Sequence, residues 1–234
     1  MLFRSRGGYG SNRLLPLLAK MKKPKEPKLL IGISDISSLH TFLIQEWGWA
    51  TLHGPLLDRL GRNLVDPKFE KEMHRILFGQ EKAVEFKKLK PLNDAAKKAK
   101  AIKAKIVGGN LTTLQSTLGT PWQIEAKNSL LFLEDLGERG YRVDRMLEHF
   151  RQAGVLKNCK GIVLGDFIGG DEPNGENKTN LVFKRWAKEL DIPLFSGMEA
   201  GHAKIQRPVP FNTSSVLQVE GGKARLTIDT GGKA

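Results

Sequence analysis

Cysteine is almost absent from this sequence, because Cys159 is the only one among 234 residues. A single thiol cannot form an internal disulfide, so folding requires no oxidising compartment. Long apolar runs are also missing: no stretch approaches the roughly 18 residues that a membrane-spanning helix needs. The N-terminal residues lack the apolar segment and the small-residue cleavage site of a secretory signal. These absences predict a cytoplasmic protein with no membrane partner.

The motifs that hold metals and cofactors are missing as well. No paired cysteines, H-E-x-x-H motif or calcium-loop spacing occurs, so we expect no metal site. The segment Gly170–Thr179 is similar to a phosphate-binding loop, but two residues separate Gly175 from Lys178, and such a loop has its lysine directly after the glycine. The glycine-rich loop Arg6–Gly10 (RGGYG) lacks the G-x-G-x-x-G spacing of a dinucleotide site. We therefore expect no cofactor.

Acidic residues are few relative to basic ones, 25 against 38, and the formal net charge is +13. Lysine is concentrated at residues 20–28 and 82–105, and the second segment holds nine lysines. Such a charge could bind nucleic acid through its phosphates. However, few aromatic residues lie among the lysines, and no helix-turn-helix, zinc-finger or RNP motif is present. We expect a solvated basic face that attracts small anionic substrates, with no nucleic-acid partner.

Strand-length and helix-length apolar segments alternate along the chain, which predicts an α/β fold. In the first part, the apolar run Leu29–Ile33 predicts a strand, the next segment predicts a helix that ends near Gly48, and Thr51–Pro55 predicts a turn. Residues 66–104 are lysine-rich and weakly patterned. We therefore expect an N-terminal lobe at 1–65, a lysine-rich linker at 66–104 and a C-terminal lobe at 105–234.

The C-terminal lobe has the clearer pattern. The glycine pair Gly108–Gly109 predicts a tight turn, Asn110 suits the N-cap of the next helix, and Gly154 stands where a helix ends. The expected strands lie at 105–107, 130–133, 161–165, 192–195, 215–219 and 224–228, and the expected helices lie at 110–118, 143–150 and 181–190.

A serine stands where the first predicted strand gives way to a helix. At that place the Ser34 hydroxyl would be exposed, and free N–H groups of the first helical turn could bind a developing oxyanion. The α/β-hydrolase signature G-x-S-x-G is incomplete, because Ile36 replaces its second glycine. A simple helix-capping role is the alternative interpretation of Ser34.

A serine nucleophile needs a base, which is most often histidine. Among the five histidines, His40 would be carried away from Ser34 by a regular helix, and His74 and His149 fall in charged helical segments. His53 and His202 each adjoin a glycine in a predicted loop, and the pattern alone does not choose between them.

The base in turn needs a carboxylate that orients it. Glu134 follows the apolar run Leu130–Leu133 directly, so we expect it at the carboxyl end of a buried strand, where the sites of α/β proteins form. A solvated acid at a strand end is the alternative interpretation. Asp135 and Glu138 are neighbouring acids that the pattern does not exclude.

Taken in order, these segments resemble the LD-carboxypeptidase (murein tetrapeptide carboxypeptidase) family of serine peptidases. Each match alone is weak, but an ordered series over nearly the whole chain is specific. The matching segments are Arg6–Gly10 with Arg13–Leu15, Gly32–Asp35, His53–Pro55, Gly108–Leu111, Gly119–Trp122, Leu131–Asp135, Tyr141–Leu147, Gly165–Phe167 and Gly201–His202.

The resemblance implies a catalytic triad in which Ser34 is the nucleophile, His202 the base and Glu134 the orienting carboxylate. It implies metal-free hydrolysis of the L,D-bond between diaminopimelate and the terminal D-alanine of a murein tetrapeptide, as a step of cell-wall recycling. The implied fold has a Rossmann- or flavodoxin-like N-terminal lobe and a mixed α/β swivelling C-terminal lobe, with the active site between them. Family members commonly form homodimers.

The same resemblance implies how the oxyanion and the substrate are held. The backbone N–H of Asp35 and one from the Gly7–Gly8 turn would bind the oxyanion, because glycine lets a backbone approach closely. The residues that we expect to bind oxyanion or substrate are Gly7, Gly8, Tyr9, Asp35, His53 and Asn110.

The sequence also departs from the family pattern. Members usually have another strand-helix-strand portion before the glycine loop, so we expect the N-terminal lobe to lack its first strands and to leave a sheet edge uncovered. Arg4 and Arg6 fall beside a strand expected to be buried, and Val209–Asn212 replaces a pattern that normally ends in glycine. Two alternatives remain: an immunity-type peptidase of the same family that cleaves a peptidyl-nucleotide antibiotic, and a truncated, non-catalytic homologue that binds muropeptide or a partner.

Overall fold

The computed structural model describes residues 2–3 and 7–231, with side chains from residue 7 onward except at positions 57 and 58. Arg4 and Arg6, expected beside a buried strand, lie outside the described residues. The strands are β1 Leu2–Phe3, β2 Leu30–Gly32, β3 Thr51–His53, β4 Ala83–Pro91, β5 Ala101–Asn110, β6 Ser129–Leu136, β7 Gly161–Ile168, β8 Leu194–Ser196, β9 Val209–Phe211, β10 Ser214–Glu220 and β11 Lys223–Asp229. The helices are the 3-10 helices η1 Ser11–Leu14 and η2 Ser34–Ile36, and the α-helices α1 Leu15–Leu18, α2 Ser37–Gln45, α3 Leu57–Gly61, α4 Pro67–Leu77, α5 Asp94–Lys98, α6 Leu111–Gln115, α7 Gly140–Gln152 and α8 Thr179–Glu189.

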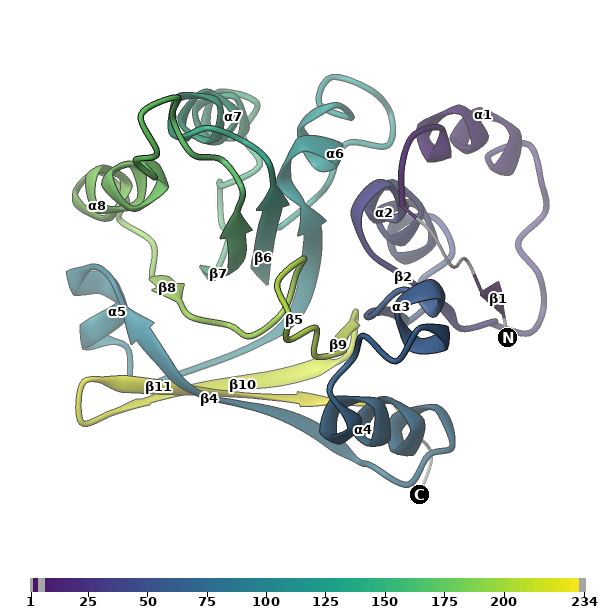
Figure 1. The fold of residues 1–234 in the computed structure, drawn as a ribbon. Coiled ribbons are helices and arrows are strands. Elements are labelled where there is room, and N and C mark those ends of the chain that lie inside the picture. The colour runs from purple at the N-terminus through teal and green to yellow at the C-terminus, as the bar shows by residue number, and fades with distance from the viewer. Residues whose placement is uncertain (1, 4–6, 232–234) are drawn as a thin grey trace.

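A small sheet forms the N-terminal part of the molecule, on the right of Figure 1. Strands β1, β2 and β3 are parallel neighbours, and β9 adds to β3 in the antiparallel direction. The turn expected at residues 51–55 is therefore wrong for residues 51–53, which form β3. A strand of three residues with partners on both sides is too short to show a sequence pattern.

The remaining seven strands form a closed barrel in the order β10, β11, β4, β8, β7, β6 and β5. The pairs from β5 through β8 are parallel, and the other pairs are antiparallel. Residues 66–104, which we expected as a linker, contain α4, α5 and the barrel strand β4. The fold is thus mixed α/β, with a small, mainly parallel sheet beside a closed seven-stranded barrel.

Strand β6 shows how the barrel is packed on both sides. Leu130 and Phe132 belong to the core inside the barrel, whereas Leu131 and Leu133 pack under α7 and α8. Figure 1 shows these two helices outside β6 and β7. Burial on both faces explains the continuous apolar run, as expected for a central parallel strand. By the same alternation, the side chain of Glu134 lies on the inner face of β6, as those of Leu130 and Phe132 do.

Strand β5 continues through a glycine pair for which we expected a tight turn, so that expectation is wrong. Both glycines have positive φ, 144° at Gly108 and 142° at Gly109. A Cβ on Gly108 would lie 1.9 Å from the carbonyl oxygen of Phe132, and one on Gly109 would lie 2.4 Å from Ser37 Oγ. The pair is therefore explained by close approach of neighbouring elements, which only glycine allows.

Most of the other elements agree with the pattern. The expected strands at 130–133, 161–165, 215–219 and 224–228 lie within β6, β7, β10 and β11. Helix α7 ends at the predicted place, since Gly154 has φ 77° just past the C-cap Ala153. Asn110 is the N-cap of α6 as predicted, although that helix ends at Gln115 and not at 118.

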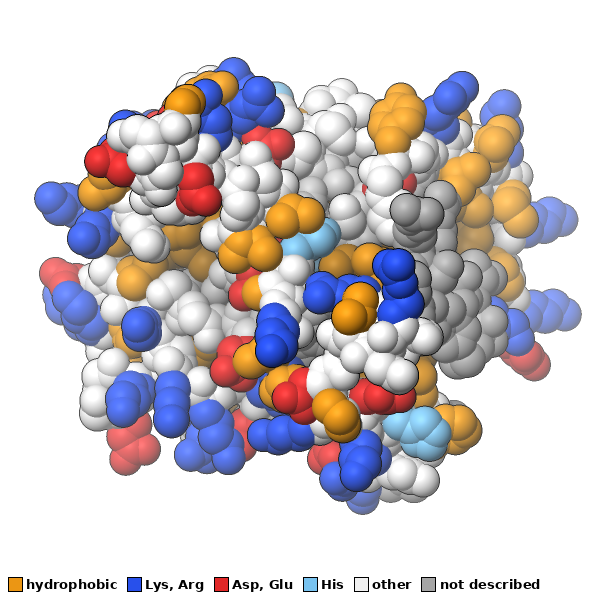
Figure 2. Space-filling view, in the orientation of Figure 1, with side chains coloured by type: hydrophobic (Ala, Val, Ile, Leu, Met, Phe, Trp, Pro, Cys, Tyr) orange, Lys and Arg blue, Asp and Glu red, His pale blue; other side chains and the backbone are white. Residues whose placement is uncertain are grey.

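The basic side chains gather along one edge of the visible face of the molecule. Lys and Arg side chains stand along the lower edge of the face in Figure 2, where β4, β10 and β11 lie in Figure 1. An open surface groove there is lined by five cations, namely Lys87, Lys88, Lys100, Lys223 and Arg225. Among the described residues, no helix combines the length and the apolar character needed to cross a bilayer.

Candidate active site

Ser34 occupies a sharp turn between a buried strand and a helix. It follows β2 by one extended residue, Ile33, and it begins η2, which continues into α2. Its φ is 67°, a left-handed conformation that few residues other than glycine adopt. A non-glycine residue held in this region at the end of a strand has the backbone geometry of a nucleophile elbow.

The glycine loop lies against this serine. A Cβ on Gly7 would stand 2.8 Å from Ser34 Cβ and 3.1 Å from Ser34 Oγ, so only glycine fits at this distance. Asp35 anchors the rest of the loop, because its Oδ2 accepts the backbone N–H of Ser11 at 2.9 Å. The Ser11 hydroxyl also bonds to the backbone oxygen of Asp35. The carboxylate of Asp35 therefore fixes the loop over Ser34, a role that the sequence did not reveal.

The helix that begins at Ser34 is fastened to the barrel. Ser37 Oγ accepts the backbone N–H of Asn110 at 2.9 Å, and η2 and α2 both contact β5. Asn110 pairs directly with Glu134 in the register of β5 and β6. These contacts bring the carboxyl end of β2 to the carboxyl ends of β5 and β6, although more than 90 residues separate Ser34 from Glu134 in the sequence.

Glu134 and His202 form a direct pair. His202 Nδ1 lies 2.6 Å from Glu134 Oε2, and Glu134 has no exposed surface. This geometry puts one proton between the two groups and leaves His202 Nε2 free to act as a base. Among the described residues, no hydrogen bond joins the Ser34 hydroxyl to His202. The structure therefore places two of the three expected triad residues in direct contact, and it packs the helical segment that begins at Ser34 against β5, the neighbour of the strand that carries Glu134.

The electrostatics of the pair suit a base. Burial lowers the pKa of His202, but the hydrogen bond and the charge of Glu134 outweigh burial and raise it. Burial raises the pKa of Glu134, and its bond to His202 offsets this only in part. A third acid, Asp166, lies close by, and burial followed by the charge of Glu134 raises its pKa to about 6.

The second candidate base, His53, is in a different environment. Its ring has 1% exposure and lies against Phe132 and Phe211, with ring centroids 5.1 and 5.6 Å away. Neither ring nitrogen has a hydrogen-bond partner within the described part of the chain. Burial, followed by the charges of His40 and His202, lowers the pKa of His53 well below its usual value. A contact between His53 and a substrate stays a prediction.

The three remaining histidines occupy two kinds of position. His40 is fully buried and its Nε2 lies 2.9 Å from the backbone oxygen of Gly32, whereas we had only expected it to point away from Ser34. His74 and His149 are exposed on α4 and α7, which agrees with their place in charged helical segments of the sequence.

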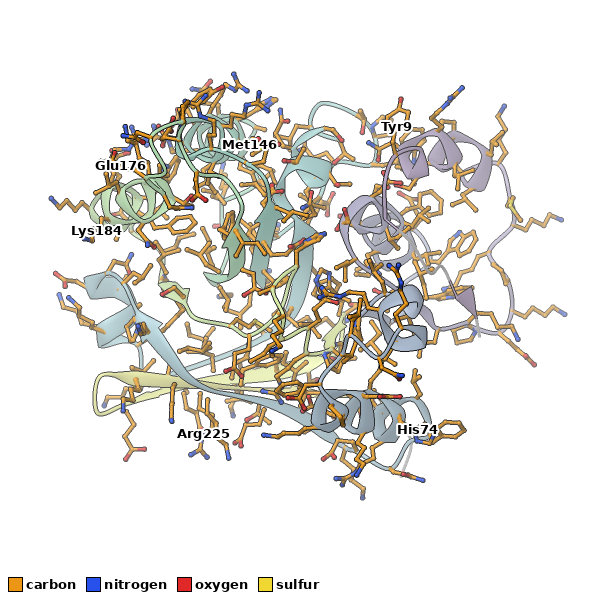
Figure 3. The ribbon with its side chains drawn as sticks, viewed as in Figure 1. Tyr9, His74, Met146, Glu176, Lys184 and Arg225 are labelled. Carbon is orange, nitrogen blue, oxygen red and sulfur yellow. The ribbon has the colours of Figure 1, made fainter. Side chains whose placement is uncertain are left out.

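The other expected binding residues differ in exposure. Tyr9 is 85% exposed and stands beside α1 in Figure 3, and Gly8 is exposed next to it. Asn110 is buried and donates through Nδ2 to Asp135 Oδ1 at 3.0 Å. Asp135 also accepts from the backbone and the hydroxyl of Thr112, so it holds the start of α6. Among the side chains that the structure describes, no group of three His, Cys, Asp or Glu is arranged to hold a metal ion.

Asp166 is a further site residue to which the sequence assigned no role. It follows the apolar run Ile162–Leu164 on β7, much as Glu134 follows its own run on β6. Because parallel neighbours end at the same edge of a sheet, the two acids could have been paired from the sequence.

Comparison with known proteins identifies relatives of the whole chain. The model of the LD-carboxypeptidase N-terminal domain matches residues 1–54, and the model of the LD-carboxypeptidase C-terminal domain matches residues 103–217. A putative carboxypeptidase of Rickettsia conorii is 45% identical over 91% of this chain and 66% of the relative. The murein tetrapeptide carboxypeptidase of Pseudomonas aeruginosa is 30% identical over 94% of this chain and 72% of that protein.

Solved structures agree with these relatives. The muramoyltetrapeptide carboxypeptidase of Oxalobacter formigenes has a TM-score of 0.75 and 28% identity, over 86% of this chain and 68% of that one. An MccF-like protein of Bacillus anthracis has a TM-score of 0.78 at 21% identity, over 96% of this chain and 74% of that one, which shows a shared fold. The chain spans just under two thirds of the length of the Rickettsia relatives, 66% and 65%. On its sequence and its fold, this chain belongs to the LD-carboxypeptidase (peptidase S66) family.

Proposed function

We propose that this protein is a serine carboxypeptidase that hydrolyses the L,D-bond before the terminal D-alanine of a murein tetrapeptide. The observation that carries the proposal is the 2.6 Å bond between His202 Nδ1 and Glu134 Oε2 at the strand ends against which the Ser34 turn is packed. Family membership and the names of the murein peptidases among its relatives support this choice of substrate.

In the proposed reaction, Ser34 Oγ attacks the carbonyl carbon of diaminopimelate while His202 Nε2 takes the hydroxyl proton. Glu134 accepts the N–H on Nδ1 and stabilises the imidazolium that results. The same imidazolium gives its proton to the nitrogen of D-alanine as the peptide bond breaks. Water then attacks the acyl-enzyme with His202 again acting as the base, and Ser34 is regenerated.

The oxyanion of each tetrahedral intermediate needs hydrogen-bond donors. We assign the backbone N–H of Asp35 and one N–H of the Gly7–Gly8 turn to this task, because Asp35 directly follows Ser34 in η2 and Gly7 lies against Ser34. Donors of this kind act on charge that develops only in the transition state, so they lower the barrier more than they favour binding.

The test is release of D-alanine from a murein tetrapeptide ending in diaminopimelyl-D-alanine. We expect turnover by the unaltered protein, and we expect Ser34→Ala to lower kcat by about 10⁴ or more, because the triad acts as a unit. Ser214→Ala, at an exposed position of β10, is the matched control and should keep full activity. Absence of D-alanine release by the unaltered protein, or full activity of Ser34→Ala, would contradict the proposal.

A second substrate separates the proposal from its nearest alternative. An aminoacyl adenylate analogue, the substrate class of the immunity-type peptidases, is supplied under the same conditions. We expect slow cleavage of this analogue or none, while the tetrapeptide is turned over. Preferential cleavage of the analogue would reassign the substrate and leave the triad in place. Binding of the tetrapeptide without cleavage of either compound would support a non-catalytic homologue.

A further inference from the structure

A β-bulge lies beside the Glu134–His202 pair. In the register of β6 and β7, Leu133 faces Leu164 and Asp135 faces Phe167. Two residues of β7, Gly165 and Asp166, therefore stand opposite the single residue Glu134. A bulge of this kind redirects a side chain, and bulges are common next to active sites. Here the redirected side chain is that of Asp166.

Asp166 holds both ends of the turn that carries His202. Its backbone N–H donates to the carbonyl oxygen of Ala200 at 3.0 Å, and its Oδ2 accepts the backbone N–H of Ala203 at 3.1 Å. His202 lies between these two anchored positions. The turn belongs to an irregular segment between β8 and β9, so side-chain contacts of this kind have to fix its conformation.

The two acids converge on Gly201, the residue before the histidine. Gly201 has φ 136°, and a Cβ there would lie 3.1 Å from Asp166 Oδ2 and 3.1 Å from Glu134 Oε2. The carboxylates of two neighbouring strands therefore reach the same turn. Glu134 binds the imidazole of His202, and Asp166 accepts the backbone N–H of the next residue, Ala203. Glycine at this position leaves room for both.

The charge of Asp166 acts on the same imidazole. Asp166 raises the pKa of His202, in addition to Glu134 and Asp135. The charged groups that act on Asp166 itself are Glu134, His202 and Glu199. An ionised Asp166 therefore favours the imidazolium that forms during the proposed reaction.

We propose that Asp166 is a positioning residue for His202: its carboxylate fixes the Gly201–Ala203 turn and supplies a second negative charge beside the imidazole. The activity measurements that test this proposal rest on the proposed function, whereas the contacts of Asp166 with the turn do not depend on it. Asp166 acts through His202, so no contact with the substrate is assigned to it.

Two substitutions separate the effect of the hydrogen bond to the turn from the effect of the negative charge. Asp166→Asn keeps an oxygen that can accept the Ala203 N–H but removes the charge, and Asp166→Ala removes both. We expect Asp166→Ala to lower kcat by about 10- to 100-fold, because a misplacement of the proposed base by about 1 Å can cost about 10²-fold. Near pH 8, Asp166→Asn should keep a kcat close to that of the unaltered protein and well above that of Asp166→Ala. Asp191→Asn removes the charge of an exposed acid before β8. It is the matched control and should change neither kcat nor the pH dependence of kcat/KM.

The pH dependence of kcat/KM distinguishes the effect of the charge from a purely structural role, which would leave it unchanged. Removing a nearby negative charge lowers the pKa of His202, so the acid limb of kcat/KM in Asp166→Asn should move about half a unit to one unit toward lower pH. Circular dichroism and thermal unfolding verify that each variant is folded. An unchanged acid limb in Asp166→Asn would overturn the electrostatic part, and full activity of a folded Asp166→Ala would overturn the positioning part.

A second measurement needs no turnover. The titration of His202 is followed by NMR in Ser34→Ala protein with labelled histidine, and His202→Gln assigns its signal among the five histidines. Asp166→Asn in this background should lower the pKa of His202 by the same half unit to one unit. An unchanged titration would overturn the electrostatic part of the inference. If the unaltered protein releases no D-alanine but the titration shifts, the proposed function fails and the electrostatic part of the inference stands.

Discussion

His40 is a histidine that the fold holds in the neutral form. Its ring is fully buried on α2, and burial lowers its pKa to about 4, although a hydrogen bond with the backbone oxygen of Gly32 opposes the shift. The unfolded chain binds a proton near pH 6.5, whereas the folded protein binds it only near pH 4. The free energy of unfolding therefore decreases as the pH falls from 6.5 to about 4, by about 3 kcal/mol in all.

We expect His40→Asn to flatten this acid dependence. Between pH 7.5 and pH 5 the free energy of unfolding should fall by about 2 kcal/mol less in His40→Asn than in the unaltered protein, because the titrating group is gone. Urea unfolding at the two pH values measures the difference. His74→Asn removes an exposed histidine and should leave the dependence unchanged. Equal acid losses in His40→Asn and the unaltered protein would show that another group is responsible.

The sequence predicted single site residues unevenly. Glu134 was selected because it ends an apolar run, its expected place at the end of a buried strand is confirmed, and its contact with His202 was implied by the family resemblance, not by any spacing. The sequence could place Asp166 near Glu134, but it could not show that Asp166 binds the turn before β9, because that contact depends on a bulge between two paired strands. The burial of His53 was also missed, because a strand of three residues, β3, has no periodicity from which its neighbours could be inferred.

At the scale of elements, the contact between α2 and β5 fixes the Ser34 turn to the barrel. A Cβ at Gly109 would lie 2.4 Å from Ser37 Oγ and 2.7 Å from Ser37 Cβ. Its φ of 142° adds backbone strain for any other residue. Both effects oppose substitution at Gly109, and the steric effect would push the first turn of α2 away from β5.

We expect Gly109→Ala to lower the free energy of unfolding by about 3 kcal/mol, the sum of overpacking and backbone strain. The matched control is Gly119→Ala: Gly119 has φ 79° but no atom within 4 Å of the added Cβ, so its loss should be about 1 kcal/mol. Urea unfolding measures both. If the two substitutions have equal effects, the close approach of α2 to β5 contributes nothing to stability.

The predicted elements were most accurate where the apolar pattern was long and regular. Strands β6 and β7 have continuous apolar runs, helix α7 has a regular apolar stripe, and the structure confirms all three elements. Strand β4 was missed inside the lysine-rich segment, because only alternate residues such as Val84 and Phe86 face the core while lysines cover the outside. A high lysine content hid the period-two pattern that such a strand has.

At the scale of the molecule, one short strand joins the two parts of the fold. Strand β9 pairs with β3 in the small sheet, and the next residue, Asn212, donates its backbone N–H to the carbonyl oxygen of Ile106 on β5. Neither the closure of the barrel nor the path of β9 could be predicted from the sequence. Both depend on pairings between residues far apart in the chain, and local patterns do not specify the partner of a strand.

Phe211 provides the strongest test of this connection. Its ring has no exposed surface and lies between His53 of the small sheet, 5.6 Å between centroids, and Phe132 of the barrel, 6.1 Å between centroids. We expect Phe211→Ala to lower the free energy of unfolding by about 3 to 5 kcal/mol, because a large buried ring is replaced by a cavity. Phe78→Ala removes a ring that is 66% exposed and should cost less than about 0.5 kcal/mol.

The same variant reports whether the two parts unfold together. Trp49 packs in the core of the small sheet, and Trp186 packs under the barrel helices. Proteins that retain only one of these tryptophans report each part separately by fluorescence during urea unfolding. Because β9 belongs to the small sheet and also contacts β5 and β11 of the barrel, we expect Phe211→Ala to lower the unfolding midpoint equally at both positions. A shift seen at Trp49 alone would mean that the small sheet unfolds independently and that β9 does not couple it to the barrel.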